Sequence, residues 1–154
     1  MEVNIYIELS TVAPRALHAS GMYLLDAREN GEQLIMAGEP WIKYEIRHFE
    51  HINSNVIALS LLKEALSRLQ KVDKLQVFTS NETIYWTLAN NWIREWRQNG
   101  WKTARGLEVK HANEWREIAY LLDKYRWTVS RDHHEWEVWM RNMLNSNGGN
   151  KYVG

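Results

Sequence analysis

The chain has 154 residues, enough for one domain with a single hydrophobic core, and its 45% hydrophobic and 25% charged residues are typical of a folded globular protein. Nineteen Lys and Arg residues balance nineteen Asp and Glu residues, which excludes a strongly basic surface over the whole molecule, and the absence of cysteine excludes disulfides and thiolate metal sites. No apolar run is long enough for a signal peptide or a membrane span, so we expect an intracellular, cytoplasmic protein.

The first third of the sequence predicts three antiparallel strands. Residues 3–9 alternate apolar and polar side chains with the two-residue period of a half-buried strand, and Glu8 lies near the end of this segment. Residues 22–25 and 33–37 flank an Asn-Gly turn and predict a hairpin. The segment 40–53 has no strong period, and we interpret it as an irregular or partly helical connection.

The rest of the sequence predicts helices and two further strands. Leucines recur at helical spacing from Ser54, the expected N-cap, to Leu69. The remaining elements are a strand at 74–80, helices at 81–99 and 113–125, a strand at 127–130 and a helix at 135–144. The order βββαβααβα predicts an α/β domain whose five-stranded mixed sheet has three antiparallel and then two parallel strands, flanked by helices. We assign residues 1–144 to this single domain and 145–154 to a flexible C-terminal tail.

Residues 90–103, NNWIREWRQNGWKT, combine three tryptophans with three cationic side chains. Trp92 and Trp96 are four residues apart, so a helix places them on one face, where such a pair either packs into the core or forms a stacking surface. We expect Trp92 to be buried, and Trp96 and Trp101 to be exposed.

This stretch resembles the type 1 ribonuclease H family, enzymes that cut the RNA strand of an RNA/DNA hybrid. In bacterial members a helix with two tryptophans leads to a basic loop ending in GWKT, and Trp92, Trp96 and residues 100–103 follow that pattern. VKHANEWREI, around Trp115, is similar to the start of a later family helix, and KLQVFTSN is similar to the family strand that ends in TDS. The resemblance covers nearly the whole chain and implies the ribonuclease H fold.

The resemblance also implies a chemistry that can be compared residue by residue. The family holds two metal ions with about four carboxylates, because Mg²⁺ prefers oxygen ligands and two adjacent cations need compensating negative charge. At the first three of these positions the sequence has Glu8, Ala58 and Ser80, and Val138 or Trp139 aligns with the carboxylate of the last helix. We therefore expect a degenerate, inactive site that binds no metal cofactor, with Glu8 as its residual position.

Loss of clustered negative charge removes the repulsion of a phosphate backbone, so binding without cutting becomes easier. We expect the domain to bind RNA/DNA hybrid or duplex nucleic acid, and to have no membrane partner. The resemblance assigns this binding surface to Asn55, Trp92, Trp96, Arg97, Trp101 and Lys102, with help from Arg94, Arg105 and Lys110.

Two alternatives remain open. An active hybrid-cutting nuclease with a rebuilt Mg²⁺ or Mn²⁺ site requires Glu8 and the run from Asp132 to Glu135 to converge. This run, with His133 and His134, could bind a metal or replace the family's catalytic histidine loop, and Glu8, Asp132 and Glu135 are the possible carboxylate set. The simpler interpretation of RDHHEWE is a solvated loop and helix start. A protein-interaction module that keeps only the fold would use residues 40–53 and the surplus tryptophans to bind a protein partner. These tryptophans are Trp41, Trp86, Trp136 and Trp139, of which the last two can instead fill space around the former active site.

Overall fold

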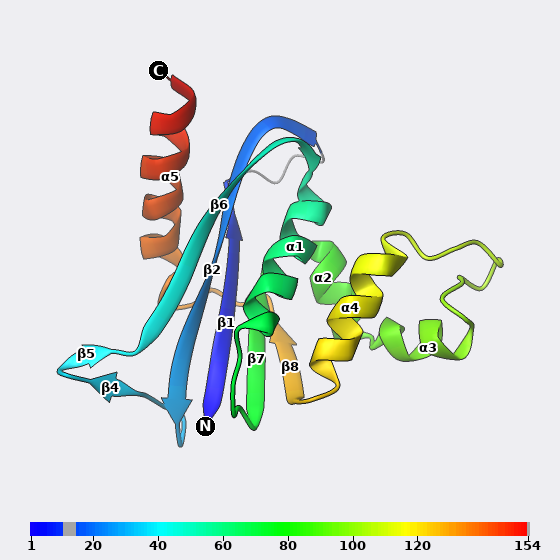
Figure 1. The fold of residues 1–154 in the computed structure, drawn as a ribbon, viewed down its shortest axis with the longest axis horizontal. Coiled ribbons are helices and arrows are strands. Elements are labelled where there is room, and N and C mark those ends of the chain that lie inside the picture. The colour runs from blue at the N-terminus through cyan, green and yellow to red at the C-terminus, as the bar shows by residue number, and fades with distance from the viewer. Residues whose placement is uncertain (11–14, 154) are drawn as a thin grey trace.

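A mixed sheet with helices on both faces forms the molecule (Figure 1). The computed structural model describes residues 1–10 and 15–153, with side chains described outside residues 15–17, 51 and 147–153. The elements are β1 Glu2–Leu9, β2 Arg15–Glu29, β3 Glu32–Gln33, β4 Ile35–Met36, β5 Glu39–Pro40, β6 Ile42–Asn53, α1 Ser54–Ser67, β7 Lys74–Thr79, α2 Glu82–Ala89, α3 Trp92–Gln98, α4 Ala112–Leu122, β8 Arg126–Ser130 and α5 Glu137–Val153.

The five long strands lie in the order β6, β2, β1, β7, β8. The central strand β1 pairs antiparallel with β2, where Ile5 lies opposite Leu25, and parallel with β7, where Ile5 lies opposite Val77. β6 pairs antiparallel with β2, and β8 pairs parallel with β7. This arrangement confirms the predicted α/β class and the predicted three antiparallel and two parallel strands.

The third long strand is β6, so the prediction of an irregular or partly helical connection at 40–53 is wrong. β6 pairs with β2 from Ile42, opposite Asp26, to Asn53, whereas residues 33–37 supply only the second residue of β3 and the two residues of β4. The apolar period is hidden because β6 contributes to both faces of the sheet: Ile42 and Ile46 pack against one core cluster, and Phe49 and Ile52 against the other.

Alternation along β1 divides the core in two, because successive side chains point to opposite faces of a sheet. Val3, Ile5 and Ile7 join the larger cluster, which α1, α2 and α4 cover, while Tyr6 joins a smaller cluster beneath α5. Glu8 therefore lies on the α5 side of the sheet. Both faces are covered, with α1 and α5 on opposite sides of the strands (Figure 1).

The predicted helix 81–99 consists of two helices. α2 ends at Ala89, and Asn91 adopts a left-handed backbone conformation with φ of 50°, a conformation that asparagine tolerates better than most residues and that turns the chain before α3. Likewise, the N-cap of α1 is Asn53 rather than Ser54, because the Asn53 side chain accepts from the Asn55 backbone N–H. After the break, α3 and the loop that follows it project away from the sheet (Figure 1).

Helix α5, Glu137–Val153, begins two residues later than predicted and continues as helix through most of the segment predicted as a flexible tail. The boundary between a domain at 1–144 and a tail stays a prediction. Within the described residues, no helix has the length and apolarity that crossing a bilayer requires.

Candidate active-site cleft and nucleic-acid interface

A cleft of about 350 Å³ lies at the carboxyl ends of the parallel strands β1 and β7, the edge at which open α/β sheets bind ligands. The first turns of α1 and α2 and one side chain of α5 complete its walls. Its polar lining includes Ser54, Asn55, Ser80, Asn81, Glu82 and Arg141.

Two asparagines join the helix starts at this cleft. Asn81 is the N-cap of α2: its Oδ1 accepts from the Ile84 backbone N–H at 2.9 Å, while its Nδ2 donates to Asn55 Oδ1 at 3.0 Å. Asn55, one of the predicted nucleic-acid-binding residues, is therefore a cleft residue fixed to α2.

The three positions at which the resemblance implies carboxylates offer only one. Ala58 is fully buried in the core beneath α1, and Ser80 is exposed at the cleft. Glu8 is 4% exposed and keeps its carboxylate on the α5 side of the sheet. The methyl group and the hydroxyl offer no anionic oxygen.

The Glu8 carboxylate is held by two side chains from the end of the chain. Its Oε2 lies 3.5 Å from Arg141 Nη2, and its Oε1 lies 3.3 Å from His134 Nε2. The Trp136 backbone N–H donates to His134 Nδ1 at 3.2 Å, so the ring hydrogen lies on Nε2 and is donated to Glu8. The His134 ring also packs against Tyr6, with 4.3 Å between ring centroids, which fixes its orientation.

Glu8, His134 and Glu137 place their ligand-type atoms within 4.8 Å of one another, and among the described residues this is the one such group. Histidine and glutamate can ligate a divalent cation, but here each of the three groups is already engaged by another side chain or backbone group. His134 Nε2 carries the ring hydrogen, the Arg141 guanidinium already lies beside Glu8, and Glu137 Oε2 lies 2.8 Å from His133 Nδ1. A metal ion would have to displace the guanidinium and reverse the histidine tautomer.

The predicted alternative trio of Glu8, Asp132 and Glu135 does not form. Glu135 pairs with Arg28, and Asp132 is exposed, with its backbone N–H bonded to Ser130 Oγ. The reason is the path of the loop before α5, which directs His134 rather than its neighbours toward Glu8.

Arg141 is the α5 side chain that reaches the cleft, and sequence reasoning missed it. The structure places neither aligned candidate there: Val138 is 71% exposed, and the Trp139 ring packs edge-on against Tyr44, with 5.1 Å between ring centroids. The α5 side chain beside Glu8 in the cleft is therefore a cation, whereas the resemblance implies a carboxylate from this helix. The spacing of Glu137 and Arg141, four residues apart on one helical face, was a signal of their proximity.

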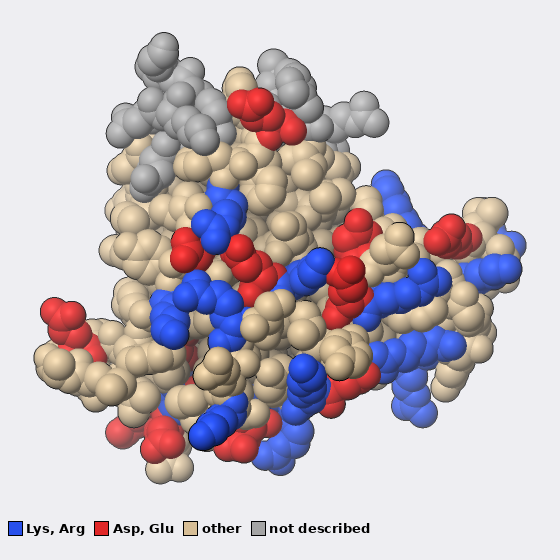
Figure 2. Space-filling view, in the orientation of Figure 1, with Lys and Arg blue, Asp and Glu red and all other residues tan. Residues whose placement is uncertain are grey.

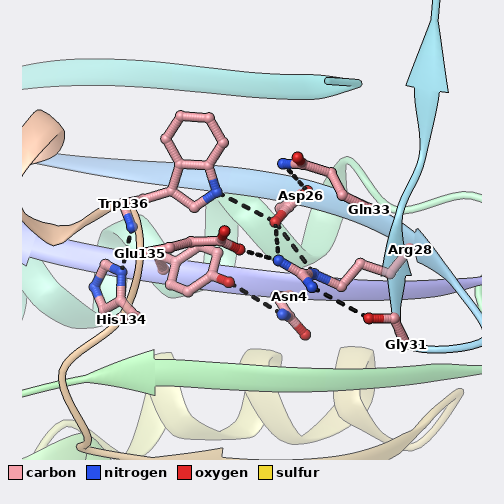
Figure 3. A network of polar contacts seen from close by, with 9 residues as sticks. Asn4, Asp26, Arg28, Gly31, Gln33, His134, Glu135 and Trp136 are labelled. Carbon is pink, nitrogen blue, oxygen red and sulfur yellow. Dashed lines mark hydrogen bonds and ion pairs between the residues drawn. The ribbon is translucent and has the colours of Figure 1, made fainter. Parts of the chain in front are cut away.

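A second polar network, also missed, anchors the loop before α5 to the sheet (Figure 3). Asp26 on β2 is fully buried and accepts from Arg28, from Gln33 Nε2 at 3.2 Å and from Trp136 Nε1 at 3.2 Å. Arg28 also bonds Glu135. The network fixes Trp136, whose backbone in turn fixes His134, so it positions the side chains at Glu8.

The surplus tryptophans have different environments. Trp136 and Trp139 pack against the core cluster beneath α5, which supports the interpretation that they fill space on this side of the sheet. Trp86 is 39% exposed on α2, where Arg131 lies over its ring. Trp41 is partly buried, with Lys43 5.1 Å from its ring centroid.

The tryptophans of α3 and the following loop form a row that ends in the core. Ring centroids are 6.3 Å apart for Trp92 and Trp96, 6.2 Å for Trp96 and Trp101, and 6.0 Å for Trp96 and the buried Trp115. Trp92 is 38% exposed, whereas Trp96 and Trp101 are partly buried against the core. The predicted burial is thus wrong: the break at Asn91 rotates α3 so that Ile93, not Trp92, enters the core.

Basic side chains gather over α3, α4 and the loop between them, with acidic side chains among them (Figure 2). The predicted Arg94, Lys102, Arg105 and Lys110 are exposed here. Arg97 makes a two-pronged pair with Asp123 at 2.9 and 2.8 Å, and Arg116 lies 5.4 Å from the Trp101 ring centroid. Arg97 and Trp101 are therefore already engaged by other side chains, whereas Trp92 and Lys102 keep exposed side chains on this surface.

Comparison with known proteins gives a consistent result in sequence and structure. The chain is 30% identical to a ribonuclease H of Clostridium botulinum over 93 residues, and 33% identical to one of Caldicellulosiruptor saccharolyticus over 82 residues. These matches cover 60% and 53% of this chain, and the chain spans about three fifths of the length of the curated relatives it matches. The chain matches no protein-family model.

Solved structures match over nearly the whole chain. LC9-RNase H1, a type 1 RNase H with the type 2 active-site motif, superposes with a TM-score of 0.69 at 18% identity, covering 97% of this chain and 72% of that one. RNase H1 from the archaeon Halobacterium salinarum gives 0.61 at 12% identity, covering 98% and 99%. The foamy viral protease-reverse transcriptase in complex with RNA/DNA hybrid gives 0.65 at 11% identity, covering 99% and 20%. The chain therefore has the ribonuclease H fold, and part of its sequence is similar to curated ribonucleases H.

Proposed function

We propose that this ribonuclease H-like domain is catalytically inactive and binds RNA/DNA hybrid or duplex nucleic acid. The observation that carries the proposal is the position of Arg141, whose guanidinium lies 3.5 Å from the buried carboxylate of Glu8. Two further facts support it, namely the methyl group of Ala58 in the core and the hydroxyl of Ser80 at the cleft.

The argument against catalysis is electrostatic. Two divalent cations that lie close together repel each other. They can bind beside a phosphate only if several anionic oxygens nearby compensate this repulsion. Here the one carboxylate at the former ligand positions is already balanced by a guanidinium. Glu137, the other carboxylate beside Glu8, lies 2.8 Å from His133 Nδ1, so two metal ions would find few free anionic oxygens and a guanidinium among them.

The argument for binding rests on the α3–α4 surface, which we define as Trp92, Trp96, Trp101, Lys102 and the exposed cations around them. An exposed indole offers a face on which sugars or bases stack, and nearby cations contact phosphates without reading sequence. From Trp92 to Lys124 the chain carries seven Lys or Arg and five Asp or Glu residues, so this surface is locally basic on a molecule of zero net charge. The similarity to a reverse transcriptase structure that contains an RNA/DNA hybrid supports the choice of ligand.

Cleavage of a labelled RNA/DNA hybrid tests the inactivity. With Mg²⁺ or Mn²⁺ added, we expect no more cleavage by the natural chain than by a Glu8→Gln variant. Metal-dependent cleavage that Glu8→Gln abolishes would contradict the proposal and establish the alternative of an active nuclease with a rebuilt site.

Binding to the same hybrid, followed by fluorescence anisotropy at low salt, tests the surface. Trp92→Ala is expected to weaken binding about tenfold, because stacking of a base on an aromatic ring contributes about 1–3 kcal/mol. Lys102→Ala is expected to weaken binding to all sequences and to reduce the salt dependence by about one counterion.

Trp86→Ala is the matched control, because Trp86 has nearly the same exposure, 39% against 38% for Trp92, and lies on α2 outside the α3–α4 surface. Equal losses in the two tryptophan variants would argue against a specific surface. No measurable affinity of the natural chain for hybrid or duplex would leave a protein-interaction module as the function of the fold.

A further inference from the structure

We propose that Arg141 binds a phosphodiester group of the nucleic acid in the cleft, so that binding there needs no divalent cation. The inference rests on the proposed nucleic-acid binding and adds a second contact site to the α3–α4 surface. In this arrangement the guanidinium supplies the positive charge that metal ions would supply to a phosphate.

The Arg141 side chain has unused hydrogen-bond donors. It is 52% exposed and lines the cleft, and its single hydrogen bond within the described part of the chain is the 3.5 Å contact between Nη2 and Glu8. A guanidinium has five N–H donors in a planar fork that matches two oxygens of one phosphate. Most of the fork is therefore available to a ligand.

Buried neighbours fix where that fork points. Glu8 is 4% exposed, it accepts from His134 Nε2 at 3.3 Å, and the His134 side chain is itself 6% exposed. An arginine anchored at one edge by a rigid carboxylate loses less side-chain entropy when it binds a ligand than a free surface arginine does.

The cleft around Arg141 offers further donors to a phosphate. Ser80 presents an exposed hydroxyl, and Asn55 uses its Oδ1 to accept from Asn81, which leaves its Nδ2 hydrogens without a partner in the described residues. Glu82 is the acidic residue in the lining and opposes an anion. Removing the Glu82 charge should therefore strengthen binding, whereas removing the Arg141 charge should weaken it.

The experiment measures the affinity of a fluorescein-labelled RNA/DNA hybrid over a series of salt concentrations, with EDTA and with Mg²⁺. We expect the natural chain to bind equally in both. Arg141→Gln is expected to weaken binding about tenfold, and to lower the slope of log affinity against log salt by about one. Glu82→Gln is expected to strengthen binding several-fold. Arg126→Gln, at the opposite end of the parallel strands, is the matched control for loss of an arginine.

A double variant separates ligand binding from charge balance at Glu8, because Arg141→Gln alone leaves a buried carboxylate without its partner and can impair folding. Glu8→Gln with Arg141→Gln restores neutrality but not the guanidinium. We expect this variant to keep the far-UV circular dichroism of the natural chain and the lowered salt slope of Arg141→Gln.

The outcomes distinguish this proposal from the previous one. Full recovery of the affinity and salt slope in the double variant, or an affinity of the natural chain that EDTA removes, would overturn the role of Arg141 while leaving the α3–α4 surface intact. Absence of any binding by the natural chain would overturn both.

Discussion

Replacing Asp26 with alanine is expected to lower the free energy of unfolding by about 3–5 kcal/mol, because it removes one partner of a buried ion pair. Asp26 is fully buried, and its carboxylate accepts hydrogen bonds from Arg28, Gln33 and Trp136. Without the carboxylate, the Arg28 guanidinium, whose side chain is 18% exposed, loses its buried counter-charge and keeps only the more exposed Glu135. The Trp136 N–H also loses its acceptor.

Urea denaturation followed by circular dichroism measures this change. The midpoints of the natural chain and the variant are compared, provided that the dependence of the unfolding free energy on urea is the same for both. Asp132→Ala is the control, because Asp132 is exposed and its carboxylate makes no ion pair among the described residues. We expect that variant to unfold at nearly the same urea concentration as the natural chain. A loss of less than about 1 kcal/mol in Asp26→Ala, the size of an exposed pair, would show that the network contributes little.

Replacing Trp115 with alanine is expected to lower the free energy of unfolding by about 3–5 kcal/mol, the usual range for a large aromatic side chain removed from a core. Trp115 is 1% exposed and belongs to the cluster beneath α1 and α4. It also supports Trp96, whose ring lies edge-on at 6.0 Å between ring centroids. The cavity therefore lies directly under the α3–α4 surface.

The same denaturation experiment on Trp92→Ala provides the comparison within one row of tryptophans. Trp92 is 38% exposed and touches Trp96 at its outer side, so its removal opens no cavity and is expected to change stability little. If Trp115→Ala and Trp92→Ala were equally stable, the difference in burial between the two ends of the tryptophan row would have no effect on stability, contrary to this prediction.

Much of the fold was predictable because long periodic segments dominate it. The alternation in residues 3–9 and the leucines after Ser54 predicted β1 and α1, and the order of the predicted elements, together with the family resemblance around residues 90–103, predicted the mixed sheet. β6 was missed because a strand that packs on both faces and carries paired charges shows no simple period: Arg47, for example, pairs with Glu64 of α1 at 2.9 Å. The break between α2 and α3 was missed because it depends on the single left-handed Asn91.

Less of the site was predictable, because its contacts depend on how one loop turns before α5. The sequence run from Asp132 to Glu135 shows four polar residues, and only the folded loop reveals that His134 alone among them reaches Glu8. Asp26 and Arg28 offered a signal, since two residues apart on a strand they share a face. Arg141 was not predicted as a site residue, although it follows Glu137 by one helical turn.

Strand β6 has a further consequence for the behaviour of the chain in concentrated solution. Its twelve residues pair with β2 along one edge, and no other described strand pairs with the opposite edge. An uncovered edge of that length is a template for intermolecular strand addition and aggregation. Because the formal net charge is zero, electrostatic repulsion between copies of the chain is weak. The charged side chains of β6 itself, Lys43, Glu45 and Arg47, are then what opposes the addition of another strand.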